Sequence, residues 1–211
     1  MARRQRMRQL QAAVVAAGLL PLAWLIQGAA RGTLGANPVE TITHTTGGWA
    51  LRLLLITLAV TPLRRLFGWS ALVPFRRTAG LLAFSYACLH FATYVALDLG
   101  FDLAAVVEDV AERPYITVGF TTFLLLVPLA ATSTRAAVRR LGRRWVRLHR
   151  LVYVAAVGAV VHFLWLVKAD LREPAIYAGI VASLLGARLW WWLSSRRASL
   201  AAHPEATSAE R

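Results

Sequence analysis

The stretch Thr78–Leu97, TAGLLAFSYACLHFATYVAL, contains no Asp, Glu, Lys or Arg. A bilayer core about 30 Å thick needs roughly 20 apolar residues in a helix, so this stretch predicts a transmembrane helix. It also contains His90, and a titratable side chain at membrane depth is costly enough to indicate a functional role. The stretch therefore predicts both the fold class and the place of a candidate site.

Five more segments have the length and composition of transmembrane helices. They are approximately Leu10–Ala30, Trp49–Leu66, Tyr115–Ser133, Leu148–Val167 and Ala175–Leu193. Of the 211 residues, 58% are hydrophobic, compared with about 45–50% in soluble domains. The sequence therefore predicts an all-α integral membrane protein built as a bundle of six transmembrane helices. Arg52 and Pro62 lie near the two ends of the second segment, where a membrane helix tolerates them.

The first segment has two interpretations. Four arginines precede its apolar stretch, and Gly28, Ala29 and Ala30 resemble a cleavage site, which together give the outline of a signal peptide. The apolar stretch is long for a signal peptide. We therefore interpret the segment as a retained transmembrane helix.

Basic and non-basic stretches alternate along the predicted loops. The loop between the third and fourth segments is acidic and contains Asp98, Asp102, Glu108, Asp109 and Glu112. The basic stretches contain Arg3, Arg4, Arg6, Arg8, Arg64, Arg65, Arg76, Arg77, Arg135, Arg139, Arg140, Arg143, Arg144, Arg147, Arg196 and Arg197. Cytoplasmic loops carry the excess of Lys and Arg, so we expect six crossings with both termini in the cytoplasm. This pattern accounts for most of the net charge of +14 without a nucleic-acid partner. The basic loops also suit anionic membrane lipid.

We divide the chain into a basic cytoplasmic N-terminus (1–9), a six-helix transmembrane domain (10–193) and a disordered cytoplasmic tail (194–211). The tail is small, polar and poor in aromatic residues. No internal repeat and no Walker, GxGxxG or HExxH motif is evident. The single cysteine, Cys88, excludes an internal disulfide and a CxxC motif. Redox chemistry would therefore need a bound cofactor, and an NAD(P)H-oxidising domain would need another polypeptide.

His90 and His162 lie at similar depths in the predicted bundle. From the rise of an α-helix, they fall about 18 Å and about 21 Å from the cytoplasmic ends of their segments. Two imidazoles at one depth on neighbouring helices suit the two axial positions of a haem iron, and iron with both positions filled suits electron transfer. The alternative is two buried histidines hydrogen-bonded to backbone or hydroxyl groups. His44 and His203 receive no role.

His149 precedes His162 on the same predicted helix by about 19 Å, and so lies at the cytoplasmic edge. Arg143, Arg144 and Arg147 stand beside it. Three interpretations remain open: a second haem with a different second ligand, an anionic cofactor such as a flavin phosphate bound by the arginines, or an interfacial histidine among lipid-facing arginines. A haem propionate is a further candidate for the arginines.

Several motifs together resemble one family. They are Asn37-Pro38-Val39-Glu40, Ile42-Thr43-His44, Thr61-Pro62-Leu63-Arg64, Tyr86-Ala87-Cys88-Leu89-His90, Arg113-Pro114-Tyr115-Ile116-Thr117-Val118-Gly119, Leu141-Gly142-Arg143-Arg144-Trp145, Leu148-His149-Arg150-Leu151 and Trp165-Leu166-Val167-Lys168. The chain resembles the haem-binding membrane subunits of the periplasmic methionine-sulfoxide reductase system (the MsrQ, or YedZ, family), within the ferric-reductase-like transmembrane group. The likeness extends from about Leu10 to Leu193.

The resemblance implies a multi-pass subunit of the bacterial inner membrane with haem b and FMN as cofactors. It implies that His90, His149 and His162 are the haem-associated histidines. Electrons would come from the quinone pool or a cytoplasmic flavin reductase. They would pass to a periplasmic molybdopterin-containing catalytic subunit that reduces oxidised methionine in proteins. The chain would then be the electron-transfer subunit of an oxidoreductase complex rather than its catalytic subunit.

Three other function classes remain as alternatives. The first is a self-contained transmembrane ferric or quinone reductase, to which the acidic loop would attract a metal ion. The second is a non-redox transporter that uses its histidines as proton relays. The third is an assembly or anchoring subunit without a cofactor. A purified protein without colour would favour the second or the third.

Overall fold

The computed structural model describes residues 2–167 and 169–202 of the chain. Its elements are α1 (Ala2–Arg31), α2 (Pro38–Phe67), the short 3-10 helix η1 (Ser70–Leu72), α3 (Phe75–Thr93), the π-helical turn η2 (Tyr94–Asp98), α4 (Leu103–Glu112), α5 (Pro114–Ala131), α6 (Arg135–Leu141), α7 (Arg143–Leu148), α8 (Leu151–Leu166) and α9 (Arg172–Ala202). No strand occurs within these described ranges. The expected all-α architecture is confirmed.

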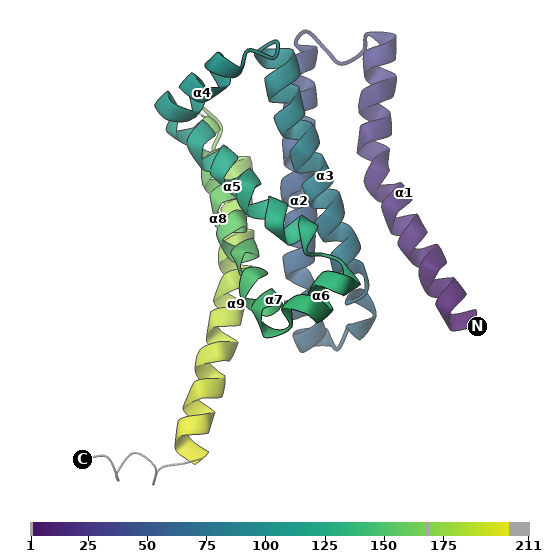
Figure 1. The fold of residues 1–211 in the computed structure, drawn as a ribbon, viewed down its shortest axis with the longest axis vertical. Helices are drawn as coiled ribbons and strands as arrows, with labels where there is room; N and C mark the ends of the chain where they lie inside the picture. The colour runs from purple at the N-terminus through teal and green to yellow at the C-terminus, as the bar shows by residue number, and fades with distance from the viewer. Residues whose placement is uncertain (1, 168, 203–211) are drawn as a thin grey trace.

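Six helical stretches are long and apolar enough to cross a membrane, as the sequence predicts. They are Arg4–Arg31, Pro38–Phe67, Phe75–Asp98, Pro114–Ala131, Arg143–Leu166 and Arg172–Arg197. Successive long helices run in opposite directions, so α1 begins and α9 ends at the end of the bundle where α6 and α7 lie (Figure 1). We call this the basic end, because the arginine-rich stretches lie there. The opposite end, where α4 lies, is called the acidic end (Figure 1).

Helix α2 is the centre of the bundle. Half of its apolar window is buried, compared with 6–22% for the other candidate spans. Its leucines, among them Leu54 and Leu58, form one core cluster with residues of α3, α8 and α9, including Tyr86 and Val160. The hydroxyl of Tyr86 donates a hydrogen bond of 2.7 Å to the Gly18 carbonyl. This buried contact joins α1 to the core.

Two helices extend beyond the predicted segments. Helix α2 begins at Pro38, three turns before the expected Trp49, because Asn37 caps it by accepting a hydrogen bond from the Glu40 N–H, and Pro38 occupies its first turn. Helix α9 continues to Ala202, whereas the sequence placed a disordered tail from residue 194. Its last residues are mostly good helix formers without Gly or Pro. Residues 203–211, including His203, lie outside the described part of the chain.

Candidate haem site

The structure brings His90 and His162 together. His90 lies on α3 and His162 on α8, each in the last turn or so before the end of its helix nearest the acidic end. Their ring centroids are 6.2 Å apart, and the ring planes cross at 75°. Both side chains are partly buried.

This separation suits two axial ligands of one metal ion. Metal–imidazole bonds are about 2.0 Å long, and a ring nitrogen lies about 1.1 Å from its ring centre, so two imidazoles on opposite sides of one metal have centroids about 6.2 Å apart. The observed separation has the same value. The separation of the two rings therefore permits both to bind one iron ion.

The outer nitrogen of each ring is already engaged by the backbone. Nδ1 of His90 lies 3.0 Å from the Thr43 carbonyl oxygen, and Nδ1 of His162 lies 2.7 Å from that of Tyr115. A carbonyl only accepts, so each Nδ1 carries the proton and donates it, which leaves the Nε2 lone pair available for a metal. Metal-binding histidines usually have such a partner on their second nitrogen, since it fixes the tautomer and the ring orientation.

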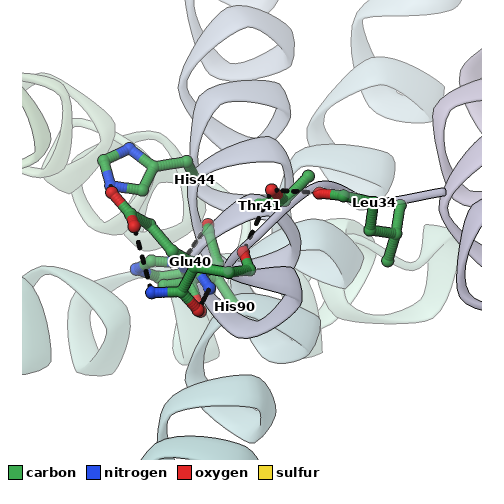
Figure 2. A network of polar contacts seen from close by, with 7 residues as sticks. Leu34, Glu40, Thr41, His44 and His90 are labelled. Carbon is green, nitrogen blue, oxygen red and sulfur yellow. Dashed lines mark hydrogen bonds and ion pairs between the residues drawn. The ribbon is translucent and has the colours of Figure 1, made fainter. Parts of the chain in front are cut away.

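The first turns of α2 hold the acceptor for His90. Asn37, Glu40 and Thr41 fix this segment: Asn37 caps the helix, and the Thr41 hydroxyl donates to the carbonyls of Leu34 and Asn37. Figure 2 shows His90 beside this turn, with Glu40 and the exposed His44 near it. The carbonyl that orients His90 therefore belongs to a well-anchored helix start.

Two glycines allow the helices to approach the rings. A Cβ atom at Gly47 of α2 would lie 3.0 Å from Nδ1 and Cε1 of His90. A Cβ atom at Gly119 of α5 would lie 2.6 Å from Nδ1 of His162 and 2.8 Å from its Cε1. Real Cβ atoms essentially never lie within 3.0 Å of such atoms. Glycine at 119 is therefore required for the observed position of the His162 ring.

The two halves of the site repeat one pattern. At one constant offset, Gly47, Ala83, Ala87, His90 and Phe91 recur as Gly119, Ala155, Ala159, His162 and Phe163, and Tyr115 occupies the position that corresponds to Thr43. In each half a carbonyl and a glycine on one helix face a histidine on the next long helix. The expectation that the chain has no internal repeat is therefore wrong. The repeated Ala-x-x-x-Ala-x-x-His-Phe was the available signal, but it is too short to stand out in an apolar sequence.

His149 lies apart from the histidine pair. It stands between α7 and α8, near the basic end, as the sequence predicts. Its Nε2 is 3.0 Å from the Thr132 hydroxyl oxygen, and its ring stacks on Trp145 with centroids 3.9 Å apart. The indole N–H of Trp145 donates to the Thr132 carbonyl at 3.0 Å. The side chain therefore belongs to a local network in this structure.

Arg143, Arg144 and Arg147 are exposed and line one open hollow at the basic end, together with Arg140 and Leu141. The hollow has a volume of about 500 Å³. None of these four arginines takes part in an ion pair within the described ranges. The arrangement suits a phosphate or carboxylate group.

The acidic loop divides into structural and exposed residues. Asp109 is buried, accepts a hydrogen bond of 2.8 Å from the Tyr94 hydroxyl and lies 3.1 Å from Arg113. A hydrogen bond with Tyr115, and next the charge of Asp109, raises the pKa of Arg113. Asp102 caps α4 by accepting from Ala104 and Ala105. This leaves an exposed acidic face, which we define as Asp98, Glu108 and Glu112.

Comparison with known proteins gives consistent results. Residues 46–160 match the family described as ferric reductase like transmembrane component. The chain is 54% identical over 203 residues to the "Protein-methionine-sulfoxide reductase heme-binding subunit MsrQ" of Xanthomonas campestris pv. campestris, covering 92% of this chain and 93% of the relative. The protein of the same description from Brucella anthropi is 53% identical over 175 residues, or 83% of this chain and 78% of that relative. No solved structure matches the chain.

Proposed function

The chain belongs to the family of haem-binding subunits of protein-methionine-sulfoxide reductases, within the ferric-reductase-like transmembrane group, and we propose that it conducts electrons through a haem b held by His90 and His162. The observation that carries the proposal is the histidine pair, whose rings have the separation of two axial ligands and donate their Nδ1 protons to backbone carbonyls. A bound haem supplies one-electron redox chemistry.

The residues of the chain have distinct tasks in this function. The Nε2 atoms of His90 and His162 would hold the haem iron, and a haem held by two histidines would supply electron transfer. The Thr43 and Tyr115 carbonyls hold the rings in orientation. Phe91, which follows His90 in the chain, packs on α5, where its ring stacks against Phe123 with centroids 5.0 Å apart.

We place the basic end in the cytoplasm, following the positive-inside rule. His90 lies about 22 Å along α3 from its start at the basic end, so the haem is close to the acidic end and hence to the periplasm. The partner is the catalytic subunit of a methionine-sulfoxide reductase. We propose that this periplasmic molybdopterin protein docks on the exposed acidic face and that the subunit works in the bacterial inner membrane.

Electrons enter at the basic end in this proposal, from the quinone pool or a cytoplasmic flavin reductase. The hollow lined by Arg143, Arg144 and Arg147 is our candidate for the phosphate of FMN or for a haem propionate. His149 would serve a second haem-associated site near this hollow. In that state its ring would leave the Thr132 hydroxyl, to which it is now hydrogen-bonded.

The test is the visible spectrum of the purified protein with haem counted by the pyridine haemochrome method. We expect a low-spin b-type spectrum that is lost in His90→Ala and in His162→Ala. His44→Ala is the matched control, because His44 lies at the same end of the bundle and is exposed. Full haem content in both site variants would refute the histidine pair as the ligands.

A self-contained ferric reductase is the second candidate, and the matched family description favours it. The two functions differ in what the isolated protein does. Steady-state reduction of a ferric chelate by purified protein without a partner would support the second candidate. Electron delivery only in the presence of the catalytic subunit would support the first.

A further inference from the structure

Arg188 is a charged residue inside the bundle. Arg188 precedes Arg196 on α9, so along the helix axis its Cα lies about 12 Å farther from the basic end than the Cα of Arg196. Its side chain is partly buried, donates to the carbonyls of Leu184 and Leu58, and places its guanidinium carbon 5.5 Å from the centre of the Tyr153 ring. An arginine at this depth needs a structural or functional reason.

Part of the reason lies in Pro62. Proline has no N–H, so the carbonyl of Leu58, one turn earlier in α2, loses its helical hydrogen bond. Arg188 donates to that carbonyl and satisfies it. A neutral donor would satisfy a carbonyl as well, and a guanidinium has five N–H donors, so this contact does not account for the charge.

Two more arginines gather near Arg188. The charges of Arg65 on α2 and Arg76 on α3 both act on Arg188, and the charge of Arg76 also acts on His149. The Arg65 guanidinium lies 5.0 Å from the Trp191 ring centre. Three helices therefore bring like charges to one region, next to the aromatic rings of Tyr153 and Trp191.

The described residues provide no carboxylate to balance these charges. The acidic residues within the described ranges are Glu40, Asp98, Asp102, Glu108, Asp109, Glu112, Asp170 and Glu173, and all of them lie in the loops and helix starts at the acidic end. Arg188 is partly buried whereas Arg65 and Arg76 are exposed, and like charges that lie close together repel. A counter-anion from outside this part of the chain would relieve the repulsion.

We propose that Arg65, Arg76 and Arg188 form a binding site for the phosphate group of an amphipathic molecule. A guanidinium fork matches phosphate oxygens in a bidentate geometry, and the rings of Tyr153 and Trp191 suit the apolar part of the ligand. The phosphate comes either from an anionic phospholipid or from flavin mononucleotide, which in that case occupies this site instead of the hollow lined by Arg143, Arg144 and Arg147. The site is separate from the exposed hollow on α6 and α7, and it does not depend on the histidine pair.

The experiment measures two probes on the detergent-purified protein: flavin mononucleotide by fluorescence quenching, and phosphatidylglycerol by native mass spectrometry with phosphatidylcholine as reference. The variants are Arg65→Gln, Arg76→Gln and Arg188→Lys. The last of these keeps the positive charge but loses the forked guanidinium group. The control is Arg196→Gln, whose side chain stacks on Trp192 instead. Haem content is recorded on each sample, so failure of the histidine pair and failure of the phosphate site are distinguishable.

We expect each site variant to weaken one probe about tenfold or more, as the loss of a charge-assisted contact predicts, while Arg196→Gln does not. The probe that responds identifies the source of the phosphate, and a response of both means that the site accepts either. Unchanged affinity for both probes in folded Arg65→Gln and Arg76→Gln would overturn the proposal.

Glu205 and Glu210 lie outside the described residues and need their own control. We expect the doubly substituted Glu205→Gln, Glu210→Gln protein to bind both probes as the native chain does. Clearly tighter binding in this variant would mean that a carboxylate of the chain itself competes for the arginines. That result would overturn the assignment of the site to an external phosphate.

Discussion

Gly119→Ala gives the sharpest test of the haem site, because it adds one carbon atom at the point of closest approach. The new Cβ would lie 2.6 Å from Nδ1 of His162, whereas ordinary van der Waals contact begins at 3.4 Å. The ring would have to move by the difference between these two distances, and the 2.7 Å hydrogen bond to the Tyr115 carbonyl would be strained or lost. Overpacking of this kind costs about 1–3 kcal/mol.

The cost should appear in haem affinity. Without haem, the His162 ring is free to rotate away from the new methyl group. Binding the iron while donating to Tyr115 requires the original position, so haem binding would bear the strain. A penalty of about 1–3 kcal/mol corresponds to roughly 5- to 150-fold weaker binding.

The assay is a haem titration of apoprotein, followed at the Soret band, with a thermal melt of each apoprotein to confirm folding. The glycines form a graded series: Gly47→Ala, with a Cβ at 3.0 Å from His90, should have a smaller effect, and Gly179→Ala, with nothing within 4 Å, should have none. Equal haem affinity in Gly119→Ala and Gly179→Ala would refute the close-approach argument.

Three further predictions follow from other parts of the structure. Asp109→Ala should lower the melting temperature while haem is retained, since loss of the buried acceptor for the Tyr94 hydroxyl costs about 1–3 kcal/mol; an unchanged melt would contradict its structural role. Arg188→Met should destabilise the native chain more than it destabilises a Pro62→Ala chain, because the N–H restored by Pro62→Ala satisfies the Leu58 carbonyl. Equal losses of stability in the two backgrounds of this double-mutant cycle would contradict the link between Arg188 and Pro62. Neutralising the exposed acidic face to Asn and Gln should slow electron delivery to the catalytic subunit at low salt, with the difference shrinking at high salt; rates equal to native at low salt would move the docking surface elsewhere.

The sequence predicted the number of long helices and the two histidines at equal depth, because both follow from hydrophobic length and from the constant rise of an α-helix. It did not predict that α2 begins at Pro38. The polar, threonine-rich stretch before Trp49 lacks the apolar signal of a span, and it becomes helical through the Asn37 cap and its contacts with α3. The turns that the sequence missed contain Thr43 and Gly47, which orient and accommodate His90.

Other features depend on tertiary contacts that the sequence does not state. Arg188 and Leu58 are far apart in the chain, and their hydrogen bond exists because α9 packs against α2 next to Pro62. The sequence likewise treated the acidic loop as one surface. Only the fold separates the buried Asp109 from the exposed acidic face.

The internal repeat also constrains the number of bis-histidine haems. The same offset that relates His90 to His162 places Arg77 at the position that corresponds to His149. The repeat is therefore complete at the acidic end and broken at the basic end, where one half offers an imidazole and the other a guanidinium. We expect the bis-histidine low-spin signal to account for one haem per chain by electron paramagnetic resonance. Any second haem should have a different spectrum, disappear in His149→Ala and persist in His90→Ala. A bis-histidine signal of two haems per chain would contradict this use of the repeat.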